Sequence, residues 1–374
     1  LNYKWEASIE DEPLTRKEFE QLIQSSEPLI NFRGRWILVD QQDIDELQNI
    51  FNAKTSDEVL LKPSGELSYL EAIKLGLTEK VQVETEGSEY DVIIEGQLTQ
   101  IIDRLKEIDS FQKSPTPDTF QGTLRPYQEA GLTWLANMCA LNFGVCLADD
   151  MGLGKTIQVI AYLLYRKEHY PQYPGSTLII CPTSIMYNWQ RELEKFAPDL
   201  EVILHHGADR LKDSQVISEY TKPHRIIITS YGTLRNDVDI LEPVPFGGVI
   251  IDESQNIKNY ASQQTQAVYS LQSQYRVALS GTPIENRLME LWSLFEFLNP
   301  GIFGSRTEFQ KNYVLPIERF QDQHATERLK AIIAPFIMRR VKTDENIIDD
   351  LPEKNEMKIY MELSESQIML YRRT

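Results

Sequence analysis

The stretch from Leu147 to Ala161, Leu-Ala-Asp-Asp-Met-Gly-Leu-Gly-Lys-Thr-Ile-Gln-Val-Ile-Ala, constrains the fold of this 374-residue chain more than any other stretch. It overlaps a short apolar run, Val145–Ala148, that is typical of a buried strand, and an apolar helical pattern begins at Ile157. Glycines within the turn let successive backbone N–H groups point at one centre, and the start of a helix adds further unpaired N–H groups. This order of strand, glycine turn and helix predicts a loop that binds phosphate groups.

The last two residues of this loop have specific chemistry. Lys155 can reach the β- and γ-phosphates of a nucleotide, and the Thr156 hydroxyl can ligate Mg²⁺. The general pattern G-x-x-x-x-G-K-T is not met, however, because Asp149 stands where the first glycine belongs. The competing interpretation is a helix that starts after a glycine turn and binds nothing.

A second stretch, Gly248–Gln255, places two adjacent acids at the end of an apolar strand. Asp252 is placed to hold Mg²⁺, directly or through water, and Glu253 to orient and deprotonate an attacking water. Phosphoryl transfer to water needs both tasks beside the γ-phosphate. A strand end with two solvated acids is the alternative, which the phosphate loop disfavours.

Two further polar stretches complete the candidate site. Ser280-Gly281-Thr282-Pro283 follows another strand, and its hydroxyls can hydrogen-bond the region of the two acids and relay the state of the nucleotide. Upstream, Gln128 offers the paired donor and acceptor that can recognise an adenine edge, and Arg125 can stack on the base. An ordinary turn and an ordinary helix N-terminus are the alternatives.

The second two-thirds of the chain alternates strand-like runs with helical patterns. Apolar, β-branched runs without polar alternation indicate strands buried on both faces, and this alternation with helices predicts an α/β fold with a parallel sheet. Ligands bind such sheets at the carboxyl ends of the strands, where the polar stretches lie. The predicted strands are Val145–Ala148, Leu178–Cys181, Val202–Leu204, Ile226–Thr229, Val249–Ile251 and Val277–Leu279.

Composition limits the remaining possibilities. No apolar stretch is long enough for a bilayer and no signal peptide opens the chain, so we expect a cytoplasmic protein without a membrane partner. The chain begins at Leu1 rather than methionine, so a fragment of a longer protein is expected. The three cysteines lack Cys-x-x-Cys spacing and are predicted to be reduced core residues, and His205-His206 to be loop histidines rather than metal ligands.

The net charge of −18 is concentrated in the first third. Residues 1–119 hold 12 Lys+Arg and 25 Asp+Glu, whereas residues 120–374 hold 26 and 31, so the remainder can still present a DNA-binding face. Residues 1–113 are predicted to form a smaller α+β accessory domain, followed by a linker at 114–119. Within this domain we expect short helices at 19–23 and 43–51, a closing helix at 97–108, and two extended pairs, 29–32 with 36–39 and 81–83 with 90–94. Its acidity has two interpretations: a solubilising surface, or a DNA mimic that restrains the remainder.

Taken as an ordered set, these motifs resemble a known family. Leu124–Gly131, Asp149–Thr156, Cys181–Ser184 with Trp189, Asp252–Gln255, Ser280–Pro283, Met338–Lys342 and Leu351–Lys354 resemble the Swi/Snf-type (chromatin-remodeller) ATPases of helicase superfamily two, bacterial type. The resemblance covers about residues 120–370. It implies a RecA-like P-loop lobe over 120–356, and residues 357–374 as the start of a connection to a second RecA-like lobe that this sequence lacks.

The resemblance also implies roles for individual residues. Lys155, Asp252 and Glu253 would be catalytic, with ATP and Mg²⁺ as cofactors and Thr156 and Asp252 as metal ligands. Gln255, Ser280 and Thr282 would couple nucleotide state to other surfaces. The residues implied to bind ATP are Arg125, Gln128, Met151, Gly152, Leu153, Gly154, Lys155 and Thr156, and those implied to face the DNA backbone are Pro182, Thr183, Ser184, Thr229, Ser230 and Tyr231.

The function implied by the resemblance is a DNA-dependent ATPase that translocates on double-stranded DNA and remodels protein–DNA complexes. A DNA-bound protein such as a polymerase or nucleoid protein would then be a further partner, and a bacterial member would be nucleoid-associated. Because a second lobe supplies the arginine finger, worth about 10³–10⁵ in rate in related sites, we expect this chain alone to bind ATP weakly and hydrolyse it poorly. The alternatives are a strand-separating DNA or RNA helicase, a nucleotide-gated binding module and an unrelated P-loop kinase.

Overall fold

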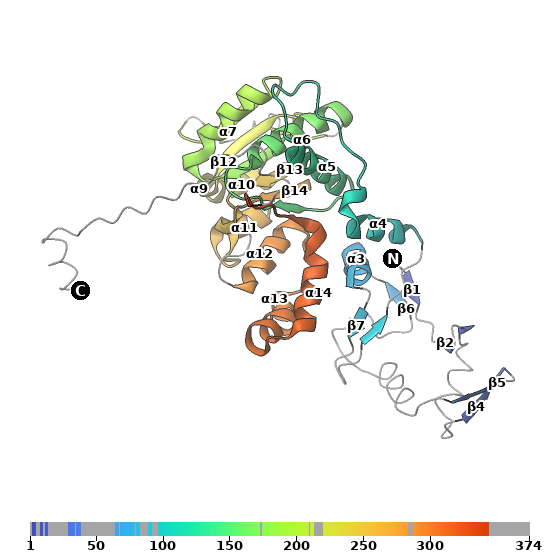
Figure 1. Ribbon diagram of the computed structural model, residues 1–374. Coiled ribbons are helices and arrows are strands. Elements are labelled where there is room, and N and C mark those ends of the chain that lie inside the picture. Colours follow the sequence, from blue (N-terminus) through green and yellow to red (C-terminus); the bar gives the residue numbers. More distant parts are fainter. Residues whose placement is uncertain are drawn as a thin grey trace, which may run out of the picture.

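The computed structural model describes most of the chain beyond residue 95. The described residues are 96–172, 174–208, 210–212, 220–282 and 287–343, together with the earlier segments 2–4, 8–9, 12–13, 29–33, 35–38, 64–66, 68–78, 80–82 and 89–91. Figure 1 shows a large body built on one sheet, with the helices α3 and α4 packed beside it.

The sheet has seven parallel strands in the order β11-β12-β10-β13-β14-β9-β15. All six strands predicted from the sequence are present, which confirms the α/β fold with a parallel sheet. The seventh, β15, was not predicted; it is only two residues long and extends the sheet beyond β9. The strands are β9 (Val145–Leu147), β10 (Thr177–Cys181), β11 (Val202–His205), β12 (Ile226–Ser230), β13 (Phe246–Ile251), β14 (Ser273–Leu279) and β15 (Ile337–Met338).

Helices cover both faces of this sheet (Figure 1). Successive residues of a strand point to opposite faces, so Ile179 packs into the core under α5–α7 while Ile180 packs into the core under α9–α11. Burial on both faces explains why these strands lack polar alternation. The helices are α5 (Pro126–Ala140), α6 (Lys155–His169) and α7 (Thr183–Phe196) on one face, and α9 (Tyr231–Asn236), α10 (Val238–Leu241) and α11 (Gln263–Tyr269) on the other.

A helical extension follows β14 and returns the chain to the sheet. Helix α12 (Leu288–Leu298) contributes side chains to both cores, for example Phe295 to one and Phe297 to the other. The chain then passes through α13 (Arg306–Phe309), the π-helix η4 (Gln310–Arg319), α14 (Gln323–Ile333) and η5 (Ala334–Phe336) before it enters β15. This extension is what brings residues beyond 336 to the edge strand β9.

The first third contains the elements that the sequence predicts wherever it is described. The hairpin of β4 (Leu29–Phe32) and β5 (Arg35–Leu38) and that of β7 (Lys80–Gln82) and β8 (Glu89–Asp91) are both antiparallel, as predicted. The closing helix is α4 (Gln97–Lys106), with a 3₁₀ turn, η2, at Ile108–Ser110. The helices predicted at 19–23 and 43–51 lie outside the described residues. Helix α3 (Tyr69–Thr78) and the pairs β1 (Asn2–Lys4) with β6 (Ser64–Glu66) and β2 (Ser8–Ile9) with β3 (Glu12–Pro13) were not predicted.

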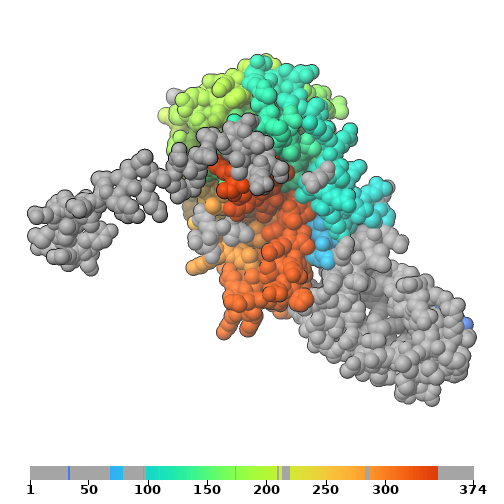
Figure 2. All heavy atoms as spheres, viewed as in Figure 1, coloured from blue at the N-terminus to red at the C-terminus, as the bar shows by residue number. Residues whose placement is uncertain are grey.

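Helix α3 packs directly on the body that carries the sheet. The Tyr69 ring stacks on Phe143 with ring centroids 5.5 Å apart, and Ile73, which is fully buried, belongs to the same core as α5 and α6. Figure 2 shows the blue surface of α3 beside the orange surface of α14. Ser114 of the predicted linker is also buried, and its N–H donates to Thr133 Oγ1 of α5 at 3.2 Å. The domain boundary at 113 stays a prediction.

Two further findings concern membrane-spanning helices and the cysteines. Among the described residues, no helix is both long enough and apolar enough to cross a membrane. Cys139, Cys146 and Cys181 are free and buried, which confirms that they are reduced core residues. Burial raises the pKa of Cys139 to about 11 and the pKa values of Cys146 and Cys181 to about 12, so these thiols stay protonated.

Candidate functional site

The loop between β9 and α6 carries the phosphate-binding pattern at the carboxyl edge of the sheet. Gly152 and Gly154 have φ angles of 88° and 77°, which residues with a Cβ rarely adopt, and Gly154 leads directly into the N-terminus of α6. Lys155 Nζ donates a hydrogen bond of 2.6 Å to the carbonyl oxygen of Asp149. Thr156 is half-buried in the first turn of the helix. The loop therefore presents a lysine, a hydroxyl and a helix N-terminus together, as an anion site requires.

Met151 and Leu153, which flank Gly152 in the loop, differ in exposure. Met151 is 73% exposed, whereas Leu153 is fully buried and anchors the loop in the core. The carbonyl oxygen of Leu153 accepts a hydrogen bond of 3.2 Å from Gln128 Nε2. In turn, Gln128 Oε1 accepts one of 3.0 Å from the backbone N–H of Arg125 at the start of α5. The structure thus places Gln128 against the phosphate loop with both ends of its amide engaged, and its proposed contact with adenine stays a prediction.

Asp149, which replaces the first glycine of the general pattern, is fully buried and paired. Its carboxylate accepts hydrogen bonds from Gln158 Nε2 of α6 at 3.1 Å and from Arg340 Nε at 2.9 Å, and Arg340 also forms an ion pair with it through a second nitrogen. Gly131 in α5 makes room for this cluster, since a Cβ there would lie 1.8 Å from Gln158 Oε1. Arg340 was not among the predicted site residues.

Asp252 follows β13 and lies at the same edge of the sheet. Its Oδ2 accepts a hydrogen bond of 2.8 Å from the indole Nε1 of Trp189 in α7, and its Oδ1 accepts one of 2.8 Å from the N–H of Glu253. Burial raises the pKa of the Asp252 carboxyl, and the two donors and the Lys155 ammonium oppose that rise. The ammonium of the phosphate loop therefore acts on the carboxyl group of Asp252.

Glu253 begins a chain of polar contacts that ends at β14. Its φ angle of 53° is left-handed and turns the chain into the 3₁₀ helix η3 (Ser254–Ile257). Gln255 Nε2 donates to Glu253 Oε2 at 2.7 Å, and its Oε1 accepts from Ser280 Oγ at 3.2 Å. Ser280 Oγ also accepts from the N–H of Thr282 at 3.0 Å. All the predicted coupling residues thus contact one another in series, and Pro283 lies outside the described residues.

The predicted DNA-facing residues divide into an exposed group and a buried group. Thr183 and Ser184 are exposed at the N-terminus of α7, and Pro182 before them is half-exposed. Their positions agree with a role in contacting a backbone, which stays a prediction.

The second group, Thr229, Ser230 and Tyr231, is buried and has internal partners. Thr229 Oγ1 donates to the carbonyl of His205 at 2.9 Å, Ser230 Oγ caps α9, and Tyr231 Oη donates to the carbonyl of Asp252 at 2.8 Å. The expectation that these three face DNA is therefore not supported for their side chains, because the strand end that carries them packs into the lobe.

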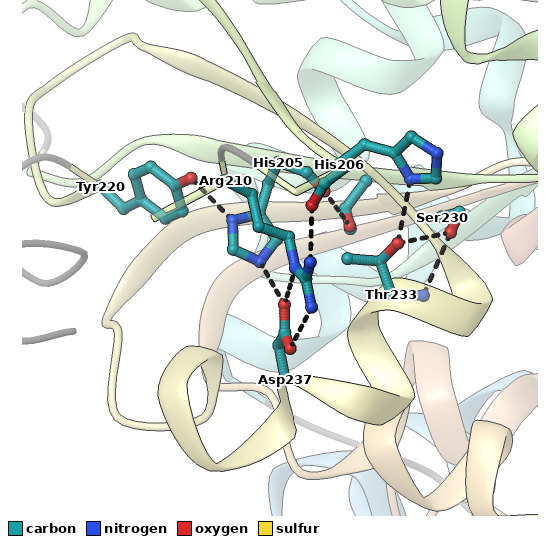
Figure 3. Close-up of polar contacts among 9 residues, drawn as sticks. His205, His206, Arg210, Tyr220, Ser230, Thr233 and Asp237 are labelled. Carbon is teal, nitrogen blue, oxygen red and sulfur yellow. Dashed lines mark hydrogen bonds and ion pairs between the residues drawn. The ribbon is translucent and has the colours of Figure 1, made fainter. Parts of the chain in front are cut away.

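A buried polar cluster lies beside this second group, at the ends of β11 and β12 (Figure 3). His205 is the last residue of β11 and is fully buried, so it is not a loop histidine. Its Nε2 lies 3.1 Å from Asp237 Oδ2 and its Nδ1 2.8 Å from Tyr220 Oη, and Arg210 pairs with the same aspartate. His206 contacts Thr233 Oγ1 at 3.1 Å. Within the described ranges no group of three His, Cys, Asp or Glu side chains could hold a metal ion.

Comparisons with known proteins agree with this geometry. The family model described as SNF2-related domain matches residues 127–374, and a model described as SNF2 Helicase protein matches residues 1–77. Over 374 residues the chain is 40% identical to YwqA of Bacillus subtilis, a protein named as a candidate ATP-dependent helicase/translocase. It is 36% identical over 271 residues to the chromatin-remodeling ATPase INO80 of Drosophila melanogaster.

The coverage of these relatives is partial. The match with YwqA covers 99% of this chain but 40% of YwqA. The match with INO80 covers 69% of this chain but 16% of INO80. Among solved structures, it is similar to the SWI2/SNF2 ATPase core of Sulfolobus solfataricus in complex with double-stranded DNA, with 45% identity and a TM-score of 0.59. That match covers 70% of this chain and 54% of the other.

The fold, the order of the motifs and the matched family model point to one assignment. The sheet, the phosphate loop after β9 and the acidic pair after β13 form a RecA-like α/β lobe. The chain belongs to the SNF2-related family.

Proposed function

We propose that the protein containing this chain is an ATPase that is stimulated by double-stranded DNA and translocates along it, remodelling bound proteins. This proposal rests on Trp189, which connects the Asp252 carboxylate to the helix whose exposed start is expected to meet DNA. Its indole N–H binds the Asp252 carboxylate, while the same helix, α7, begins with the exposed Thr183 and Ser184. One rigid helix therefore links the hydrolytic site to the surface expected to meet DNA.

The residues present fit ATP with Mg²⁺ as cofactors. The Thr156 hydroxyl and the Asp252 carboxylate are hard oxygen ligands of the kind that Mg²⁺ prefers, and they would hold the ion, which would neutralise charge on the β- and γ-phosphates when bound. Lys155 would leave the Asp149 carbonyl to bind phosphate. Glu253 would orient the attacking water and accept its proton, since Gln255 holds one of its carboxylate oxygens by a hydrogen bond of 2.7 Å.

Contacts with duplex DNA are proposed for the exposed start of α7. Hydroxyl groups and helix N-terminal N–H groups bind backbone phosphates without reading base sequence, as a translocase needs. The DNA complex of the similar Sulfolobus solfataricus core supports this assignment. A DNA-bound protein partner and a cytoplasmic, nucleoid-associated location stay predictions.

The test is the ATPase rate of the intact protein with duplex DNA, single-stranded DNA and structured RNA. We expect stimulation mainly by duplex DNA, its loss in Lys155→Ala, and a loss of about 10²–10⁴ in kcat in Glu253→Gln with ATP binding retained. Lys167→Ala is the matched control, because it removes a lysine from the other end of α6.

Each other outcome has a defined meaning. Stimulation of the ATPase only by RNA or by single-stranded DNA would favour a strand-separating helicase over a translocase on duplex DNA. ATP binding without hydrolysis in the presence of any of these nucleic acids would favour a nucleotide-gated binding module. Equal rates in Lys155→Ala and the unmodified protein would show that hydrolysis does not use this loop.

A further inference from the structure

The segment Met338–Lys342 runs alongside the phosphate loop. It continues the parallel pairing of β15 with β9, since the N–H of Ala148 donates to the carbonyl of Met338 at 2.7 Å and that of Asp150 to the carbonyl of Arg340 at 3.0 Å. The strand pairing thus extends into the loop itself. Residues from the end of the helical extension therefore fix the backbone at the start of the phosphate loop.

Arg340 compensates the buried charge of Asp149. The guanidinium binds both carboxylate oxygens, the backbone N–H of Arg340 donates to Oδ1 at 3.2 Å, and Gln158 donates to Oδ2. A buried carboxylate that is left unpaired is strongly destabilising, and its negative charge beside the loop would oppose a polyphosphate. Arg340 removes both problems with one bidentate contact.

The same arginine reaches the start of α5. It donates to the carbonyl of Tyr127 and, at 2.6 Å, to Gln158 Oε1. Tyr127 precedes Gln128, whose amide holds the carbonyl of Leu153 in the loop. Arg340 therefore joins the strand end, the phosphate loop, α5 and α6 at one point.

Lys342 lies at the open side of the loop. Its backbone N–H donates to Asp150 Oδ2 at 3.1 Å, and its ammonium is placed over Gly152, where an added Cβ would meet Nζ at 3.2 Å. Lys342 is exposed, so its stem can adjust to a ligand. An exposed ammonium beside Gly152 of the phosphate loop is within reach of a bound phosphate group.

We propose that the segment Arg340–Lys342 completes the phosphate site, with Arg340 as a positioning residue that holds Asp149 and the loop, and Lys342 as a second cationic ligand for the nucleotide phosphates. This inference rests on the proposed ATP binding at Lys155. It gives the departure from G-x-x-x-x-G-K-T a physical reason, because an acid in place of the first glycine needs a cation beside it.

The test is calorimetric binding of Mg·ATP and of ADP to the intact protein and its variants. Arg340→Gln should weaken ATP binding roughly 10- to 100-fold, the effect of losing a hydrogen bond between charged groups. Lys342→Ala should weaken ATP binding more than ADP binding, and this difference should shrink at high salt. Arg339→Gln is the matched control for charge, because Arg339 is the exposed neighbour of Arg340.

A second readout separates positioning of the loop from general stability. Amide hydrogen exchange at residues 150–155 should accelerate in Arg340→Gln, whereas exchange in β10 should not change. If Arg340→Gln does not fold, Arg340→Lys is the substitute variant. It keeps the positive charge but loses the bidentate guanidinium, so its ATP affinity should lie between those of the unmodified protein and a variant without the charge.

The outcomes distinguish the two proposals. If the unmodified protein does not bind ATP, the proposed function fails. If it binds ATP and Arg340→Gln melts earlier but binds with unchanged affinity, Arg340 is merely structural and the inference about it is overturned. Equal losses of ATP and ADP affinity in Lys342→Ala would remove the role of that lysine toward the terminal phosphate.

Discussion

The indole Nε1 of Trp189 donates a hydrogen bond of 2.8 Å to Oδ2 of Asp252, although the two residues are 63 positions apart in the chain. This contact joins α7 to the end of β13. It stabilises the ionised form of a carboxylate whose burial favours the protonated form. A change at this one atom should therefore affect the chemistry more than the fold.

Trp189→Phe keeps the buried ring and removes the N–H donor. We expect roughly tenfold lower kcat/KM at neutral pH. Since the lost donor had lowered the pKa of Asp252, the acid limb of the pH–rate profile should move to higher pH. Trp134→Phe is the control, because it also removes a buried indole donor, to the carbonyl of Pro335, but not near Asp252. An unchanged pH profile in Trp189→Phe would contradict the assigned role of this bond.

The exposed hydroxyls of Thr183 and Ser184 give a prediction about DNA affinity. The double substitution Thr183→Ala/Ser184→Ala should weaken duplex binding by a similar factor for any base sequence, because phosphate contacts carry no sequence information. Affinity would be measured by fluorescence anisotropy at several salt concentrations. Ser110→Ala removes an exposed hydroxyl from η2 and should bind like the unmodified protein. Loss of affinity for one sequence alone would argue against backbone contact.

His205 predicts a pH dependence of stability. Its Nε2 faces the Asp237 carboxylate, so this nitrogen carries the proton and Nδ1 accepts from Tyr220 in the neutral ring. Burial lowers the pKa of His205 despite the opposing effect of Asp237. The unfolded chain then binds more protons below about pH 6.5, so the melting temperature should fall as the pH decreases through that region.

The measurement for His205 is thermal unfolding between about pH 8 and pH 5. His205→Gln should melt at a lower temperature at pH 8 and lose part of the slope, the remainder coming from His224, whose pKa burial also lowers. His324→Gln, at an exposed position of α14, should keep the slope. A slope that is the same in all three proteins would place its origin elsewhere.

The packing of α3 predicts that it unfolds together with the sheet. Ile73→Ala removes a fully buried side chain from the core shared with α5 and α6, and it should cost about 2–5 kcal/mol. Differential scanning calorimetry should show the main transition moving to lower temperature as a whole. If only a separate early transition moved, α3 would belong to an independent unit.

Local patterns in the sequence predict the sheet and the two catalytic stretches. Apolar runs such as Ile226–Thr229 are buried on both faces, so their composition alone indicates a strand. Acids and hydroxyls that directly follow such runs must lie at the carboxyl edge, because parallel strands align their ends. Position along the chain therefore suffices to bring Asp252 and Ser280 toward the phosphate loop.

What the sequence does not predict depends on contacts between distant residues. Ile337 and Met338 form the two-residue strand β15, which is too short to show a periodic pattern. Only the preceding helices bring this strand to β9. Arg340 is 191 positions from its partner Asp149, so no local sequence pattern around either residue indicates their contact. The hydroxyl of Thr229 makes an internal hydrogen bond, which its residue type alone does not indicate because a threonine hydroxyl equally suits a phosphate contact.

The pairing of β15 with β9 has a consequence for the newborn chain. At about 5–20 residues per second, a ribosome needs roughly ten seconds or more to proceed from Asp149 to Arg340. Throughout that interval the strand that leads into the nucleotide loop has an open edge, which in other proteins invites pairing with foreign chains. During this interval the carboxylate of Asp149 lacks its partner Arg340, and that of Asp150 lacks the backbone N–H of Lys342. Two adjacent unpaired carboxylates disfavour such pairing until β15 arrives.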